Sequence, residues 1–337
     1  MERLTACSMR SDSTCRDRRV IRATGPLAAL LLGMVVVWAP GVAAQTTDQP
    51  VARFTTPFRS ATELVPLQLA VMDGSRRYVP DLQVDDFAVF EEGVRQNVTL
   101  FAAATAPLDV MLLLDTSFSM VQRMGVLQEA AINFVRALKE GDRAAVVPFN
   151  QVVRVTQPLT RDLARVEDAI RAATPSGGTA VHEAIYIALR ELTRARRDAD
   201  QLRRQAMVVL TDGLDNSSHV TLADVVSEAR RSTVTMYTVV PPSAAEDAFP
   251  RGRPLPLYDL RSLAEETGGR MFVPARLEDL ADTYREIAEE LSQQYWLAYV
   301  PSVRAEGFRR VSVRVATRPE LSVRTRSGYY ANTPRLR

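Results

Sequence analysis

Five side chains with oxygen donors either follow apolar runs of the sequence or open a helical segment. They are Asp115, Ser117, Ser119, Thr179 and Asp212. Carboxylate and hydroxyl oxygens are hard ligands, and Mg²⁺ in proteins binds such oxygens in octahedral geometry while keeping some of its waters. The segment Pro-Ser-Gly-Gly-Thr at 175–179 adds two glycines, which let the backbone approach closely. If the fold brings these segments together, they predict a magnesium site.

The chemistry of this donor set indicates binding rather than catalysis. Serine and threonine oxygens are neutral, so a bound cation keeps positive charge that attracts an acidic side chain from a partner. A P-loop requires a lysine after glycine, and the single lysine, Lys139, stands instead in the segment Ala-Leu-Lys-Glu at 137–140. The two histidines, His182 and His219, are poorly placed for a zinc motif or a Ser-His-Asp triad. We therefore predict that the protein is not an enzyme.

Strands alternate with helices between residues 107 and 293. Apolar runs predict buried strands at 109–114, 144–149, 206–210, 234–240 and 270–273, with an edge strand at 152–155. Helical spacing of apolar residues predicts helices at 124–138, 163–173, 181–196, 222–231, 260–267 and 277–293. This alternation specifies an α/β fold with a doubly wound, mainly parallel sheet and helices on both faces. The carboxyl ends of parallel strands meet at one sheet edge, so the loops that carry the five oxygen-bearing residues should lie together there.

The flanking segments, residues 45–106 and 294–337, have a period of two instead. Val65, Leu67, Leu69 and Val71 alternate with other residues, and so do Val311, Val313 and Val315. Neither segment has enough strands to bury an apolar face by itself. The simplest arrangement pairs both segments into one small β-sandwich, with the α/β domain inserted between them. Two separate β modules packed on the central domain are the alternative.

Residues 1–44 have the features of a signal peptide. A basic stretch leads into the apolar run 27–38, and small residues precede a cleavage site predicted after Ala44. Twelve largely apolar residues are too few to span a membrane, which needs about 20, although an uncleaved anchor is the alternative. Six arginines and three acidic residues give this segment a charge of +3, so the overall +2 leaves the remainder near −1. A body with that charge disfavours nucleic-acid binding. We predict export to the periplasm or the extracellular space.

The pattern Asp-Thr-Ser-Phe-Ser at 115–119, Thr179 after Ser-Gly-Gly, and Asp212 in Leu-Thr-Asp-Gly resemble the metal-ion-dependent adhesion site (MIDAS) of von Willebrand factor type A (VWA) domains. The order and spacing are similar across residues 108–293, and the flanks 85–96, 294–301 and 328–330 resemble exported bacterial proteins of the "VWFA-related" group. The resemblance implies that Ser117 and Ser119 bind the metal directly. It implies that Thr179 binds directly or through water, and that Asp115 and Asp212 act largely through water or as hydrogen-bond acceptors.

The predicted function is an exported, metal-dependent protein-binding or adhesion module that captures an acidic group of a partner. Mg²⁺ is the expected ion, with Mn²⁺ and Ca²⁺ as alternatives. Candidate ligand contacts are Phe118, Gly178 and Asp215; Phe118 stands where the family often has a small residue, and it either projects onto the binding face or packs under a loop. The alternative function is a structural or assembly subunit of a cell-envelope complex whose metal site is incidental or stabilising.

Overall fold

The protein is described here by a computed structural model that covers residues 64–102, 106–197, 202–212, 215–242, 256–303 and 305–331. All of these belong to one compact unit, residues 59–337. The predicted signal peptide and its cleavage site lie outside the described residues. None of the helices in the described ranges is long and apolar enough to cross a membrane.

A six-stranded sheet forms the centre of the α/β domain, with the strand order β10-β9-β8-β5-β6-β7. The strands are β5 (Leu108–Asp115), β6 (Arg143–Phe149), β7 (Gln157–Thr160), β8 (Arg204–Leu210), β9 (Thr235–Val239) and β10 (Met271–Phe272). All neighbours pair in parallel except β7, which runs antiparallel to β6 at one edge. Every residue of β5 and β8 is buried, as expected for strands covered on both faces.

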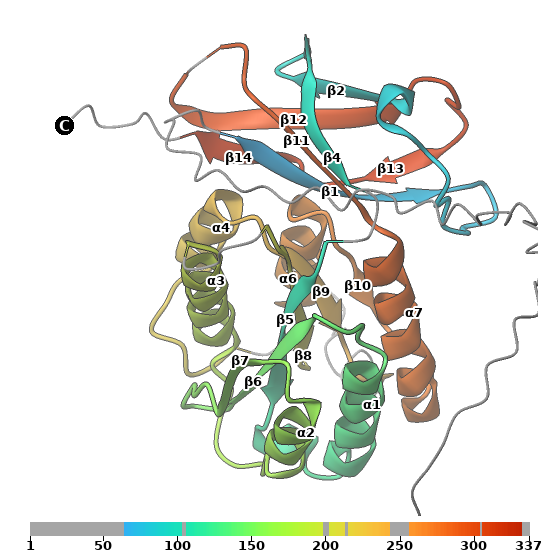
Figure 1. The fold of residues 1–337 in the computed structure, drawn as a ribbon. Helices are drawn as coiled ribbons and strands as arrows, with labels where there is room; N and C mark the ends of the chain where they lie inside the picture. The colour runs from blue at the N-terminus through green and yellow to red at the C-terminus, as the bar shows by residue number, and fades with distance from the viewer. Residues whose placement is uncertain are drawn as a thin grey trace, which may run out of the picture. The chain divides into compact units, whose positions relative to one another are not determined.

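Helices cover both faces of this sheet (Figure 1), which confirms the doubly wound fold. One face packs against α1 (Met124–Arg136), α2 (Leu163–Arg171) and α7 (Leu280–Gln293). The other face packs against α3 (Val181–Arg197), α4 (Leu222–Arg231) and α6 (Pro256–Glu266). Short 3₁₀ turns are η1 (Val84–Asp86), η2 (Phe118–Met120) and η3 (Leu277–Asp279).

The edge strand predicted at 152–155 is wrong. Within that segment Val153 forms only an isolated bridge with Phe149, and the strand that pairs with β6 begins at Gln157. The reason is a local turn: the Asn150 side chain accepts a hydrogen bond from Val152 N at 2.8 Å, and Asn150 N donates to Val152 O. An asparagine side chain that bonds the backbone two residues later competes with strand pairing.

The strands from the two ends of the chain form one β-sandwich, as predicted, and the alternative of two separate modules is wrong. Its sheets have the orders β13-β1-β11-β4 and β14-β12-β2-β3. The strands are β1 (Val65–Met72), β2 (Phe87–Glu91), β3 (Val94–Gln96), β4 (Val98–Ala102), β11 (Tyr295–Tyr299), β12 (Gly307–Val315), β13 (Ser322–Arg324) and β14 (Gly328–Ala331). Each sheet contains strands from both chain ends, and their inward side chains share one apolar core.

The sandwich contacts the amino-terminal edge of the central sheet. Gln68 Nε2 in β1 donates to Gln205 O in β8 and to Thr233 O just before β9, at 3.0 and 2.9 Å. Since these contacts lie where β8 and β9 begin, the carboxyl ends of the parallel strands point away from the sandwich. Asp115 and Leu210, the last residues of β5 and β8, therefore lie at the end of the sheet away from these contacts.

A buried carboxylate joins the sandwich to α7. Glu290 accepts hydrogen bonds from Tyr78 Oη at 2.8 Å, from Tyr237 Oη at 2.5 Å and from the guanidinium of Arg324. Its Oε2 also lies 3.3 Å from Arg270 Nε. Tyr78 and Arg324 come from the sandwich, whereas Tyr237 and Arg270 come from the α/β domain. One fully buried carboxylate thus holds both parts together.

We expect Glu290→Ala to lower the free energy of unfolding by about 3–5 kcal/mol, because it leaves two arginines of the interface without their buried counter-charge. The control is Glu286→Ala. Glu286 pairs with the same Arg270, but its side chain is 50% exposed. Glu286→Ala should therefore lower the free energy of unfolding by less than about 1 kcal/mol. Urea denaturation measures both values, and equal losses would contradict the assignment of Glu290 as the main link.

Candidate metal-ion site

Asp115 is the last residue of β5, and its carboxylate is held from two sides. Oδ1 accepts a hydrogen bond from Ser117 N at 2.8 Å, and Oδ2 accepts one from Thr211 Oγ1 at 2.7 Å. The following Thr116 donates from its backbone N and its hydroxyl to Phe149 O, at 2.7 and 3.0 Å. The loop after β5 is thereby tied to the ends of both neighbouring strands.

Burial raises the pKa of the Asp115 carboxyl from 3.8 to about 6. Hydrogen bonds from Ser117 and Thr211 act in the opposite direction, and the negative charge of Asp212 adds to the increase. The ionised form of Asp115 is therefore disfavoured in the metal-free fold. A cation bound beside it would supply the missing stabilisation, so this environment fits a metal site.

Two serine hydroxyls connect this loop to Asp212. Ser117 Oγ lies 3.0 Å from Ser119 Oγ, and Ser119 Oγ donates a short hydrogen bond to Asp212 Oδ2. Ser117 and Asp212 are buried, whereas Ser119 is exposed. Hydroxyl and carboxylate oxygens that follow β5 and β8 thus lie together, and one of their residues, Ser119, is exposed to solvent.

The segment 175–179 packs against the loop that follows β5. Ser176 N donates to Thr116 O at 2.6 Å, and Phe118 N donates to Gly177 O at 3.2 Å. Thr179 is buried at its end, held through its backbone: its N donates to Asn216 Oδ1 at 2.8 Å, and its O accepts from the backbone N of Asn216. The structure therefore places Thr179 next to the loops of the other four residues.

The donor set matches a hard cation. Among the described residues there is no group of three or more His, Cys, Asp or Glu side chains that could hold a metal. The convergent ligands are instead hydroxyls supported by two carboxylates, which suits an oxygen-binding ion such as Mg²⁺. Metal binding by Asp115, Ser117, Ser119, Thr179 and Asp212 stays a prediction, and the geometry is compatible with it.

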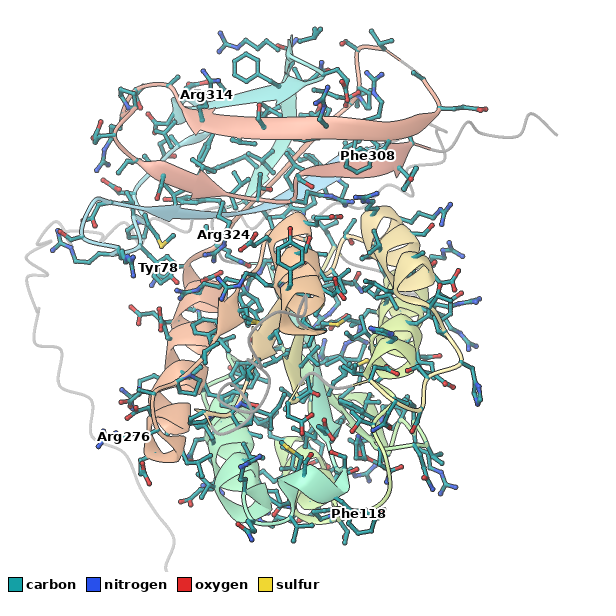
Figure 2. All side chains as sticks on the ribbon, turned by 180° about the vertical axis from the view of Figure 1, so that it is seen from behind. Tyr78, Phe118, Arg276, Phe308, Arg314 and Arg324 are labelled. Carbon is teal, nitrogen blue, oxygen red and sulfur yellow. The ribbon has the colours of Figure 1, made fainter. Side chains whose placement is uncertain are left out.

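The three candidate ligand contacts have different environments. Phe118 is 69% exposed, so it does not pack under a loop but projects from the end of the α/β domain (Figure 2). Gly178 packs so closely on residues 216 and 217 that an added Cβ would lie 2.5 Å from Ser217 Oγ. Asp215 accepts hydrogen bonds from His182 N and Ser218 Oγ, at 2.8 and 2.6 Å, and so caps the start of α3.

Sequence reasoning did not identify three residues that support the site. Thr211 orients Asp115, Asn216 holds the backbone of Thr179, and Arg123 donates from Nη1 to Ser119 O at 3.3 Å. For Thr211 a signal was available, because it directly precedes Asp212 at the end of a buried strand. The position of Asn216 depends on how the loop after β8 folds back on 175–179, and no local pattern indicates that contact.

The fold and the site together define a class of protein: a doubly wound α/β domain with oxygen-bearing side chains gathered at the carboxyl edge of its sheet. The sequence model of the von Willebrand factor type A domain matches residues 109–286, more than half of the chain, and the chain belongs to this family. VWA domains are known as a metal-dependent adhesion and protein-interaction fold.

The individual proteins and structures that are similar to this chain share low sequence identity with it. An uncharacterized protein of Synechocystis sp. is 28% identical over 137 residues, which are 39% of this chain and 32% of that protein. The match therefore spans about a third of that relative's length. A von Willebrand factor type A structure from Catenulispora acidiphila is 17% identical, with a TM-score of 0.47, and the similarity covers 77% of this chain and 71% of that one. An aerotolerance-related membrane protein from Bacteroides fragilis is 21% identical, with a TM-score of 0.44, covering 55% and 98%.

The raised pKa of Asp115 predicts an unusual pH dependence of stability. Because the folded pKa of about 6 exceeds the reference value of 3.8, the folded state binds more protons between these values. In EDTA, raising the pH from 4 to 7 should therefore lower the stability of the wild type relative to Asp115→Asn, by up to about 3 kcal/mol.

Chemical denaturation of both proteins across this pH range measures the difference. Millimolar Mg²⁺ should abolish the decrease, because the cation favours the ionised carboxylate. Parallel curves for the two proteins in EDTA would show that Asp115 does not titrate in this way.

Proposed function

We propose that this chain is a metal-dependent protein-binding module. The observation that carries the proposal is the convergence of Ser117, Ser119 and Asp212 at a point that is buried on one side and open to solvent at Ser119. Ser117 and Ser119 would hold the ion directly, with Thr179 binding directly or through water. Asp115 and Asp212 would orient the hydroxyls, and from the buried side of the site they would offset part of the positive charge of the ion.

The ion would supply an open coordination position for a carboxylate of the partner. Its direct ligands from this chain are neutral hydroxyls, so it keeps an attraction for an outside anion that a cage of carboxylates would cancel. We propose Mg²⁺ as the resident ion, with Mn²⁺ and Ca²⁺ as alternatives. The family is generally one of non-enzymatic interaction modules, and we propose the same for this chain.

We also propose that the protein acts after export, in the periplasm or outside the cell. The support is the basic, apolar and small-residue sequence of the segment 1–44, which lies outside the described residues.

Mg²⁺ should stabilise the metal-free wild type but not Ser119→Ala. An ion that binds only the folded state stabilises it by about 2.7 kcal/mol at a concentration of 100 times its Kd. Thermal unfolding in EDTA and in rising Mg²⁺ measures the effect. Ser75→Ala, an exposed serine of the β-sandwich, is the matched control and should respond like the wild type. A full Mg²⁺ response in Ser119→Ala would rule out this serine as a ligand.

Capture of a partner should depend on the same ion. The immobilised full chain should retain a protein from an envelope extract in Mg²⁺ and release it in EDTA, whereas Ser119→Ala should retain none and Ser75→Ala should behave as the wild type. Capture that survives EDTA would favour a structural or assembly subunit whose metal site is incidental.

A further inference from the structure

We propose that the site selects acidic side chains with a leucine-sized apolar neighbour in the partner's sequence, and that Phe118 determines this selectivity. This inference rests on the proposed function and specifies its ligand. It is drawn from the exposed apolar side chains of the turn that carries Ser119 and of the neighbouring turn at 150–152.

The Phe118 ring is exposed on a well-held backbone. Phe118 N donates to Gly177 O, Met120 N donates to Ser117 O, and the Met120 side chain is fully buried in the core of the α/β domain. The turn is therefore anchored on both sides of the ring. A fixed aromatic side chain that is 69% exposed offers apolar area at a defined place, and its burial by a ligand is favourable without ordering the loop first.

A second apolar side chain lies on the same side of this turn. Val121 N donates to Phe118 O at 3.3 Å, which closes a 3₁₀ turn. In 3₁₀ geometry the side chains at positions i and i+3 lie one above the other. Val121 is 53% exposed, so the turn presents two exposed apolar side chains, Phe118 and Val121, on either side of Ser119 in the sequence.

The turn that holds Val152 lies on the other side of Gly177. A Cβ added to Gly177 would lie 2.9 Å from the side chain of Gln151, and Asn150 Nδ2 donates to Ser176 Oγ at 3.0 Å. Val152 is 49% exposed. The turn that holds Val152 therefore packs against Gly177, whose φ is 69°, so Val152 is an exposed apolar residue on the turn next to that of Phe118.

A cationic side chain, Arg123, also contacts this turn. Arg123 reaches Ser119 O with one of the five N–H donors of its guanidinium, next to the position of the proposed ion. A cation and a guanidinium together favour a carboxylate over a neutral or basic group. Charge and apolar area thus specify one occupant: a polypeptide segment that presents an acidic side chain directly beside an aliphatic or aromatic one.

Short Gly-Ser peptides with a central Leu-Glu, Glu-Leu, Ser-Glu or Leu-Gln pair test this inference. Immobilised on a surface plasmon resonance chip, they report the equilibrium affinity of the full chain in Mg²⁺ and in EDTA. We expect the better of the two Leu-containing Glu peptides to bind about tenfold more tightly than Ser-Glu, as burial of a leucine side chain implies. Leu-Gln should not bind, and EDTA should abolish all binding.

The variants separate the apolar and charged contributions. Phe118→Ser should lower the affinity for the Leu-containing peptide to that for Ser-Glu, and should leave both the Ser-Glu affinity and the Mg²⁺ Kd from calorimetry unchanged. Arg123→Ala should weaken both Glu peptides by a similar factor. Val94→Ser, which removes a valine that is 52% exposed in the β-sandwich, is the control and should change neither affinity.

Equal affinity for the leucine and serine peptides, or a preference that survives Phe118→Ser, would overturn the inference and leave the proposed function standing. Absence of EDTA-sensitive binding to every peptide would overturn both. Mg²⁺-dependent self-association of the wild type that Phe118→Ser abolishes would identify a second copy of this chain as the occupant and would also overturn the inference.

Discussion

The burial of the Asp115 carboxylate at the end of a central strand is the constraint on which the site depends. An ionised carboxylate without solvent is unfavourable, and two hydrogen bonds only partly offset the effect of burial on its pKa. Every residue of the strand that ends at Asp115 is buried, so this carboxylate is removed from solvent together with its strand. A cation in front of Asp115 would relieve the penalty, so the same burial that destabilises the free protein favours metal binding.

The hydroxyls in front of Asp115 determine what such an ion can do. Ser117 and Ser119 add oxygen donors without adding charge, and only Ser119 is exposed. The charged groups, Asp115 and Asp212, stay buried behind them. This separation of neutral ligands from charged supports would leave the ion attractive to a carboxylate from outside, in contrast to a site made of carboxylates alone.

The β-sandwich lies at the opposite edge of the sheet, and this placement keeps the site open. Gln68 contacts the beginning of β8, and Glu290 connects α7 with Tyr78 and Arg324 of the sandwich. Strand β4 ends at Ala102 and its partner β11 begins at Tyr295, so the α/β domain is inserted between strands that pair in one sheet of the sandwich. The stability of the sandwich therefore depends on long-range pairing, which the buried polar contacts of Glu290 reinforce.

The sequence alone determined the alternation of strands and helices and predicted five residues for the metal site. These features follow from local periodicity and from the rule that parallel strands end at one edge. The sequence favoured pairing of the two ends into one sandwich, with two separate modules as the alternative, and the structure decided between these. Tertiary structure decided the rest. The Asn150 turn moved the edge strand to Gln157, Thr211 and Asn216 became supports of the site, and Phe118 remained exposed rather than packed. The Asn150 turn is local but depends on hydrogen bonds that hydrophobic periodicity does not report. The roles of Thr211 and Asn216 depend on contacts between loops far apart in the chain, and local patterning carries no information about which loops meet.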